Sequence, residues 1–153
     1  MINRKNVIDH LCALNELGWN DWFAQKSACR PEHSIARVAA VDREQLLLAD
    51  QTGTFRAKLA GSYLHRHHLD HERPCVGDWV SLEKQPGDDF GIVHEILERR
   101  TSLRRKSAGN EVGYQMIAAN VDYVIIVQSC LSDFNVNRLE RYLVMVTDGG
   151  AGP

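Results

Sequence analysis

Hydrophobic residues recur at helical spacing at the start of the chain. Between residues 6 and 17 they form one stripe, made of Val7, Ile8, Leu11, Leu14 and Leu17. Gly18 follows at the position where a helix commonly ends, so the pattern predicts a short amphipathic helix. Trp19, Trp22 and Phe23 come next and predict a local hydrophobic cluster, and Pro31 then interrupts the helical period.

From residue 34 the pattern changes to short runs of β-forming residues separated by turn residues. Five runs predict strands, at 35–41, 45–49, 54–59, 78–82 and 92–96. Short gaps between the first three are typical of antiparallel hairpins, and a longer connection, 60–76, precedes the fourth. The pattern predicts a mainly β protein built on a five-stranded Greek-key barrel of the OB-fold type. An SH3-like barrel is the alternative architecture.

Two further patterns follow the predicted barrel. Five of the eight residues 99–106 are basic, which predicts a basic linker over 99–115. The nearly continuous apolar run 121–127 is typical of a strand buried on both faces of a parallel sheet. Val136, Leu139, Leu143 and Val146 then predict a helix that ends before Gly149.

This last strand and helix lack a returning strand, so they are expected to be the first strand and helix of an incomplete α/β domain in a truncated chain. The expected organisation is an N-terminal helical extension (1–33), the barrel (34–98), the basic linker (99–115) and the beginning of the α/β domain (116–153). If 121–153 is exposed, it is expected to favour self-association of an otherwise monomeric fragment.

Composition adds few constraints. Of 153 residues, 44% are hydrophobic and 25% charged, and the net charge is -2, so attraction to nucleic acid requires local basic patches. No apolar run is long enough for a membrane span or resembles a signal peptide, which predicts a cytoplasmic chain without membrane contact. The cysteines, Cys12, Cys29, Cys75 and Cys130, form no C-x-x-C pair and are expected to be buried free thiols.

Catalytic motifs are missing from the sequence. It contains no G-x-x-x-x-G-K-[ST] phosphate loop, no Asn-Lys-x-Asp guanine-binding element, no G-x-S-x-G and no H-E-x-x-H. We therefore expect no catalysis by this chain alone, no catalytic residue and no cofactor bound to it.

Histidines are concentrated in the connection between the third and fourth strands. Four of the seven lie there: His65, His67, His68 and His71. His67 and His71 could share one metal ion if the segment is helical, which makes a metal-responsive or protein-interaction module an alternative function. The competing interpretation, favoured here, is a solvated polar loop that binds no metal.

Basic residues suggest nucleic-acid binding instead. Arg37 in the first strand, with Arg56 and Lys58 in the third, alternates with apolar neighbours and is expected to face solvent on the side where OB folds hold their ligands. The linker would extend this surface with Arg99, Arg100, Arg104, Arg105 and Lys106. Each phosphate contact would add salt-dependent affinity.

Several stretches, in this order, carry a family resemblance. They are 18–20 (GWN), 36–38 (ARV), 76–80 (VGDWV), 97–106 (LERRTSLRRK), 118–129 (AANVDYVIIVQS) and 133–143 (DFNVNRLERYL). The chain resembles the N-terminal portion of the bacterial ribosome small-subunit-dependent GTPase A family (RsgA), in which an OB-fold domain precedes a circularly permuted GTPase domain.

The resemblance implies a role in late maturation of the small ribosomal subunit, with the barrel docking on ribosomal RNA (rRNA). It also implies GTP, Mg²⁺ and a structural Zn²⁺, all bound by regions that this chain lacks. The leading hypothesis is therefore an rRNA-binding part of a ribosome-biogenesis GTPase, inactive alone. A complete GTP hydrolase, of which this chain is only a part, is the second hypothesis.

Overall fold

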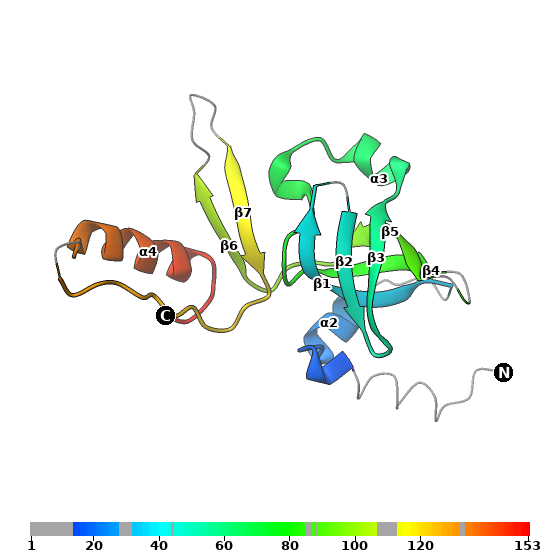
Figure 1. The fold of residues 1–153 in the computed structure, drawn as a ribbon, viewed down its shortest axis with the longest axis horizontal. Coiled ribbons are helices and arrows are strands. Elements are labelled where there is room, and N and C mark those ends of the chain that lie inside the picture. Colours follow the sequence, from blue (N-terminus) through cyan, green and yellow to red (C-terminus); the bar gives the residue numbers. More distant parts are fainter. Residues whose placement is uncertain are drawn as a thin grey trace.

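The structure is a computed structural model that describes residues 14–27, 32–43, 45–84, 87, 89–106, 113–131 and 134–153. Its elements follow one another in the order α2 (Asp21–Lys26), β1 (Ser34–Asp42), β2 (Gln45–Asp50), β3 (Gly53–Leu59), α3 (Gly61–Arg66), a 3-10 turn η1 (Asp70–Glu72), β4 (Trp79–Lys84), β5 (Phe90–Ile96), β6 (Ser102–Lys106), β7 (Tyr114–Ala119) and α4 (Val136–Asp148) (Figure 1). Residues 14–16 are helical and belong to the first predicted helix; the rest of that prediction, before residue 14, lies outside the described residues.

Five strands close into a barrel in the order β1-β2-β3-β5-β4, with β4 pairing back to β1. All pairs are antiparallel except β3 with β5, which is parallel. Each of the five strands predicted for the barrel is present and shifted by at most a few residues at its ends. The predicted OB-type barrel is confirmed.

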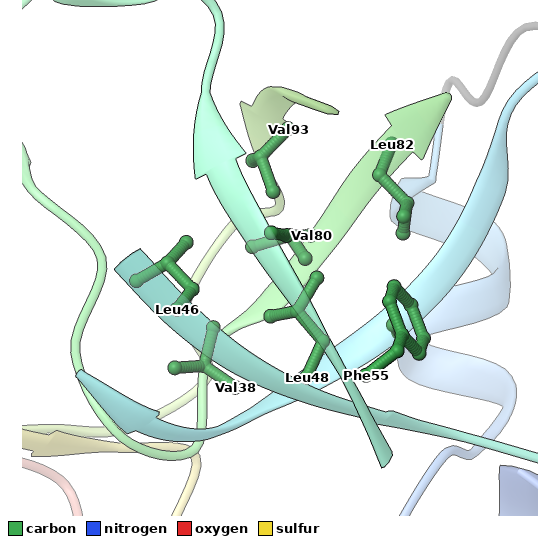
Figure 2. Packing of buried hydrophobic residues seen from close by; sticks show 9 residues of the cluster. Val38, Leu46, Leu48, Phe55, Val80, Leu82 and Val93 are labelled. Carbon is green, nitrogen blue, oxygen red and sulfur yellow. The ribbon is translucent and has the colours of Figure 1, made fainter. Parts of the chain in front are cut away.

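Alternation along the strands fills the barrel with apolar side chains (Figure 2). In β3, Phe55 and Ala57 are buried, whereas Arg56 and Lys58 between and beside them are exposed. The cluster inside the barrel consists of Ala36, Val38, Leu46, Leu48, Phe55, Ala57, Val80, Leu82 and Val93. Each large side chain buried in this way contributes about 1.5–3 kcal/mol to stability.

A second cluster joins the N-terminal segment to the outside of the barrel. Trp19 packs edge-on against Trp79 of β4, with ring centroids 4.8 Å apart, and stacks on Phe23 at 5.7 Å. Trp79 is completely buried. The predicted aromatic cluster is thus confirmed, and it fixes α2 against the barrel wall.

The C-terminal third is a hairpin, β6–β7, beside the helix α4. The helix was predicted. The hairpin was not, because β6 lies within the stretch assigned to a basic linker.

The strand predicted over 121–127 is not formed. Its only β contact in the described part of the chain is an isolated bridge between Tyr123 and Gly152, and Ile125 and Val127 are 88% and 89% exposed. A strand requires a neighbouring strand to satisfy its backbone N–H and C=O groups, and one bridge does not provide it.

Two smaller expectations have mixed outcomes. Cys75 is a buried free thiol as expected, but Cys130 is exposed; Cys12 and Cys29 lie outside the described residues. None of the helices that the structure describes is long and apolar enough to cross a membrane.

Candidate nucleic-acid interface

Arg37, predicted to face solvent, is instead used inside the protein. Its guanidinium donates to the backbone carbonyls of Leu17, Gly77 (3.3 Å) and Asn120 (2.8 Å), and it lies 5.7 Å from the ring centre of Trp79. Burial lowers the pKa of Arg37 below its ordinary value. Since three carbonyl groups from separate segments hold it, Arg37 connects the N-terminal helix, the barrel and the end of β7.

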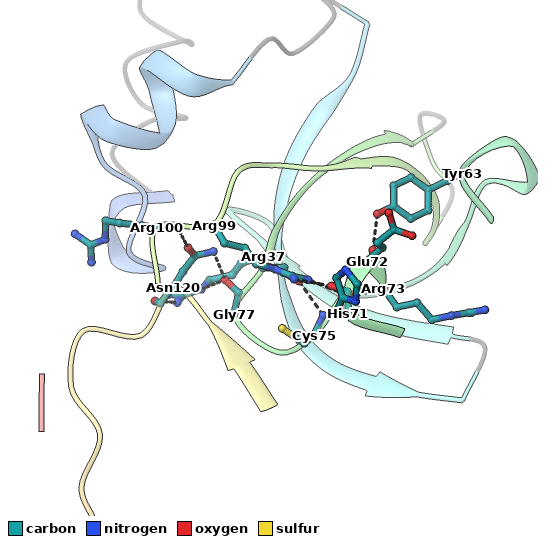
Figure 3. Close-up of polar contacts among 11 residues, drawn as sticks. Arg37, Tyr63, His71, Glu72, Arg73, Cys75, Gly77, Arg99, Arg100 and Asn120 are labelled. Carbon is teal, nitrogen blue, oxygen red and sulfur yellow. Dashed lines mark hydrogen bonds and ion pairs between the residues drawn. The ribbon is translucent and has the colours of Figure 1, made fainter. Parts of the chain in front are cut away.

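The same junction depends on Gly77 and Asn120 (Figure 3). Asn120 donates from Nδ2 to the Gly77 carbonyl (3.0 Å) and accepts from the Arg100 backbone N–H (2.8 Å). Gly77 has a φ of +90°, and a Cβ there would lie 2.0 Å from the carbonyl oxygen of Ala119. Only glycine permits this close approach, so the backbone itself joins barrel and hairpin.

Arg99 is also occupied by internal contacts. Its guanidinium forms a bidentate ion pair with the carboxylate of the completely buried Asp78, with both N–O distances 2.8 Å. It also donates to the backbone carbonyls of His71 (2.8 Å) and Arg73 (2.9 Å). Burial acts to lower the pKa of Arg99, but hydrogen bonding and the charge of Asp78 outweigh it and raise the pKa. Asp78 accepts a further bond from the Cys75 N–H (2.8 Å), and burial raises the pKa of the Cys75 thiol to about 12.

Arg99 therefore fastens the histidine-rich connection to the barrel. Tyr63 in that connection donates to the Glu72 carbonyl (2.7 Å) and stacks on His67 at 4.3 Å, and His67 Nδ1 lies 3.5 Å from a Glu72 carboxylate oxygen. Burial raises the pKa of Tyr63 to about 12. The rings of His65 and His68 lie edge to face, with centres 6.1 Å apart. Across the described ranges, no three histidine, cysteine or acidic side chains gather as metal ligands.

Three other predicted residues lie on the surface of the barrel or at its junction. Arg56 is 3.7 Å from Asp42 in an exposed ion pair, and Lys58 lies 5.9 Å from the ring centre of Phe90. Arg100 is paired with Asp122. The two exposed ion pairs are worth little energetically, so Arg56 and Arg100 can exchange their partners for other anions.

The remaining predicted residues, Arg104, Arg105 and Lys106, line a groove between the hairpin and α4. The hairpin and the helix lie side by side in Figure 1. The groove has a volume of about 600 Å³. Its basic lining residues are Arg104, Arg105, Lys106, Arg138 and Arg141. Tyr114 and Tyr142 line it too, and Asp148 is the one acidic residue among the described lining residues. Arg104 lies over the ring of Tyr114 at 4.7 Å, and Arg105 donates to Gln115 (3.1 and 2.9 Å).

Arg138 and Arg141 were not predicted as site residues. The available signal was their spacing of three on a predicted helix, which places both on the same face. A groove with several cations and two aromatic rings can bind a phosphate backbone and stack a base, as nucleic-acid-binding surfaces do.

Comparisons with known proteins agree with this architecture. A family model described as RsgA GTPase matches residues 96–153. The small ribosomal subunit biogenesis GTPase RsgA of Opitutus terrae is 34% identical over 152 residues, which cover 92% of this chain and 41% of that protein. The protein of the same name from Xanthomonas axonopodis pv. citri is 37% identical over 139 residues, covering 90% of this chain and 36% of its own length.

Two solved structures share the fold. YjeQ from Thermotoga maritima superposes with a TM-score of 0.55 at 21% identity, over 78% of this chain and 38% of its own. YloQ, described as a circularly permuted GTPase, superposes with a TM-score of 0.55 at 20% identity, over 83% of this chain and 41% of its own.

The barrel and the match of residues 96–153 define a class, namely proteins in which an OB-type barrel precedes a segment similar to the RsgA GTPase model. Within that class, this chain belongs to the RsgA family and corresponds to its N-terminal portion, spanning roughly two fifths of the length of these relatives.

Proposed function

We propose that this chain supplies an rRNA-docking surface of a small-subunit biogenesis GTPase. The observation that carries the proposal is the groove between β6–β7 and α4, where five basic side chains and two tyrosines line one depression. The chain as a whole has a net charge of -2, so this groove is a local departure from the overall charge.

The ligand chemistry follows from the groove. Arginine guanidinium groups bind phosphate oxygens through paired N–H donors, and each contact releases counterions from the nucleic acid. Tyr114 and Tyr142 offer rings on which unpaired bases can stack. Arg56 and Lys58 on the barrel would act as additional, weaker phosphate contacts, while Arg37 and Arg99 would hold the surface in place rather than touch RNA.

The biological partner is suggested by the relatives, which are named small ribosomal subunit biogenesis GTPases. We infer that the RNA is that of the small ribosomal subunit. GTP and Mg²⁺ would be bound by parts of the relatives that this chain does not span, because the sequence has no phosphate loop. Docking and hydrolysis would then lie in different parts of the whole protein.

The direct test is co-sedimentation of the 153-residue chain with purified small and large ribosomal subunits at two salt concentrations, with GTP hydrolysis assayed on the same sample. The expected result is binding to the small subunit only, weakening as salt rises, without hydrolysis. Equal binding to both subunits, or no binding at either salt concentration, would contradict the proposal.

A further inference from the structure

A second pocket is lined by residues of the barrel and of α3. These elements lie apart from β6 and α4, which line the groove (Figure 1). Its volume is about 410 Å³. The apolar lining residues are Val41, Leu46, Leu59, Leu64 and Pro74, and the cationic ones are Arg43, Lys58 and Arg73. They come from β1, the turn after it, β2, β3, α3 and the segment after η1.

Charge in this pocket has one sign. No acidic residue is among its described lining residues, and none of Arg43, Lys58 and Arg73 forms an ion pair with a carboxylate in the described part of the chain. The nearby Asp42 is instead turned to Arg56. Three cationic side chains in one pocket, without a carboxylate partner among the described residues, predict an anionic ligand.

The apolar side of the pocket restricts which anion fits. Leu46 is almost completely buried, whereas Val41 and Leu64 are 45% and 38% exposed. An inorganic anion would gain nothing from these surfaces. A ligand with a flat apolar body and a phosphate would use both, and the volume lies within the usual range of about 300–1,000 Å³ for small-ligand sites.

We propose that this pocket holds a single unstacked nucleotide of the bound RNA. The base would lie against Leu46, Leu64 and Pro74, and its flanking phosphates would meet Arg43, Lys58 and Arg73. RNA offers such nucleotides at bulges and loops, where bases leave the helical stack. The proposal rests on the proposed function and deepens it, because the pocket would add to the contacts of the groove a separate selection, on the barrel, for sites with an extruded base.

The test uses two RNA hairpins that differ by one bulged nucleotide, with binding to the full chain measured by fluorescence anisotropy. The wild type is expected to bind the bulged hairpin about tenfold more tightly, the scale of one base-stacking contact. Leu64→Glu should remove this preference without changing affinity for the unbulged hairpin. Leu69→Glu is the matched control, since Leu69 is 56% exposed in the same connection and does not line the pocket.

Failure of this inference can be separated from failure of the proposed function. Arg104→Gln/Arg105→Gln should weaken both hairpins equally and keep the tenfold ratio. A wild-type ratio near one, or a ratio that Leu64→Glu leaves unchanged, would overturn the pocket assignment while groove binding stands. Binding of an acidic apolar peptide, lost in Leu64→Glu, with no bulge preference would also overturn it and make the occupant a protein segment.

If neither hairpin binds, the proposed function fails, and the pocket is judged by NMR titration with adenosine monophosphate and with inorganic phosphate. Amide shifts clustered around 41–46, 58–64 and 73–74, at about tenfold lower concentration of the nucleotide than of phosphate, would support a nucleotide site. Equal or unlocalised shifts would overturn it.

Discussion

The barrel and the C-terminal third use the same types of residue for opposite purposes. Arg99 is held by the buried Asp78, whereas Arg104 and Arg105, a few positions later in the same basic run, line an open groove. Leu48 is completely buried in the barrel, whereas Ile125 is 88% exposed. Arg99 and Leu48 are thus enclosed by other parts of the fold, whereas Arg104, Arg105 and Ile125 remain available to partners.

The largest effect that this comparison predicts is at the buried ion pair. Arg99→Gln leaves the Asp78 carboxylate buried without its partner, and such losses cost about 3–5 kcal/mol of unfolding free energy. Arg100→Gln, the neighbouring residue in an exposed pair, should cost less than about 1 kcal/mol. Urea denaturation measures both. Equal losses of unfolding free energy would show that the buried ion pair of Arg99 contributes no more to stability than the exposed ion pair of Arg100.

Next comes apolar burial. Leu48→Ala should cost about 2–5 kcal/mol because it leaves a cavity inside the barrel. Ile125→Ala should change the unfolding free energy by less than about 0.5 kcal/mol, since its side chain lies mostly in water. The same denaturation experiment compares them, and a loss at Ile125 comparable to that at Leu48 would mean that the C-terminal third has a core of its own.

The junction between the two regions should be sensitive to one methyl group. Gly77→Ala places a Cβ against the Ala119 carbonyl as well as in a left-handed backbone, so the expected loss is at least about 2 kcal/mol. Gly87→Ala is the control, because its φ is +85° but no atom of the described residues lies within 4 Å of the added Cβ. Thermal unfolding should give a lower melting temperature for Gly77→Ala than for Gly87→Ala. Similar melting temperatures would mean that the contact with the Ala119 carbonyl adds nothing to the backbone strain that both variants share.

The buried thiol makes the stability depend on pH, with no effect near neutral pH. The pKa of Cys75 is raised from 9.0 to about 12 in the folded state. Above pH 9 the unfolded chain therefore loses a proton that the folded chain keeps, and stability falls by about 1.4 kcal/mol per pH unit until the folded pKa is reached. Below pH 9 the contribution is fully present. Urea denaturation from pH 8 to 11 should show a steeper decline for wild type than for Cys75→Ala, and parallel curves would refute the assignment.

How far the sequence predicts this molecule depends on the range of the interaction concerned. Alternation in β3, with Phe55 and Ala57 inward, is visible in neighbouring residues, and the barrel followed from such patterns. The β6 strand was hidden because Arg104, Arg105 and Lys106 are consecutive charges without alternation. The apolar run 121–127 has strand composition but only one bridge partner, which no local pattern reveals.

The site was predictable in part for the same reason. Exposure of Arg56 and Lys58 followed from alternation. The position of Arg37 did not, because it is fixed by carbonyl groups 20, 40 and 83 residues away in sequence. Arg138 and Arg141 join the groove only because α4 lies beside β6, a tertiary contact that helical spacing cannot supply.

The RNA-docking role of the groove is tested directly by the salt dependence of binding to the small ribosomal subunit for Arg104→Gln/Arg105→Gln. A charge-matched control is Lys26→Gln/Arg66→Gln, which removes two cations that do not line the groove. The slope of log K against log salt is expected to fall by about two in the groove variant, one for each phosphate contact, and to keep its wild-type value in the control. Equal slopes in all three proteins would contradict the assignment of the groove as the RNA-docking surface.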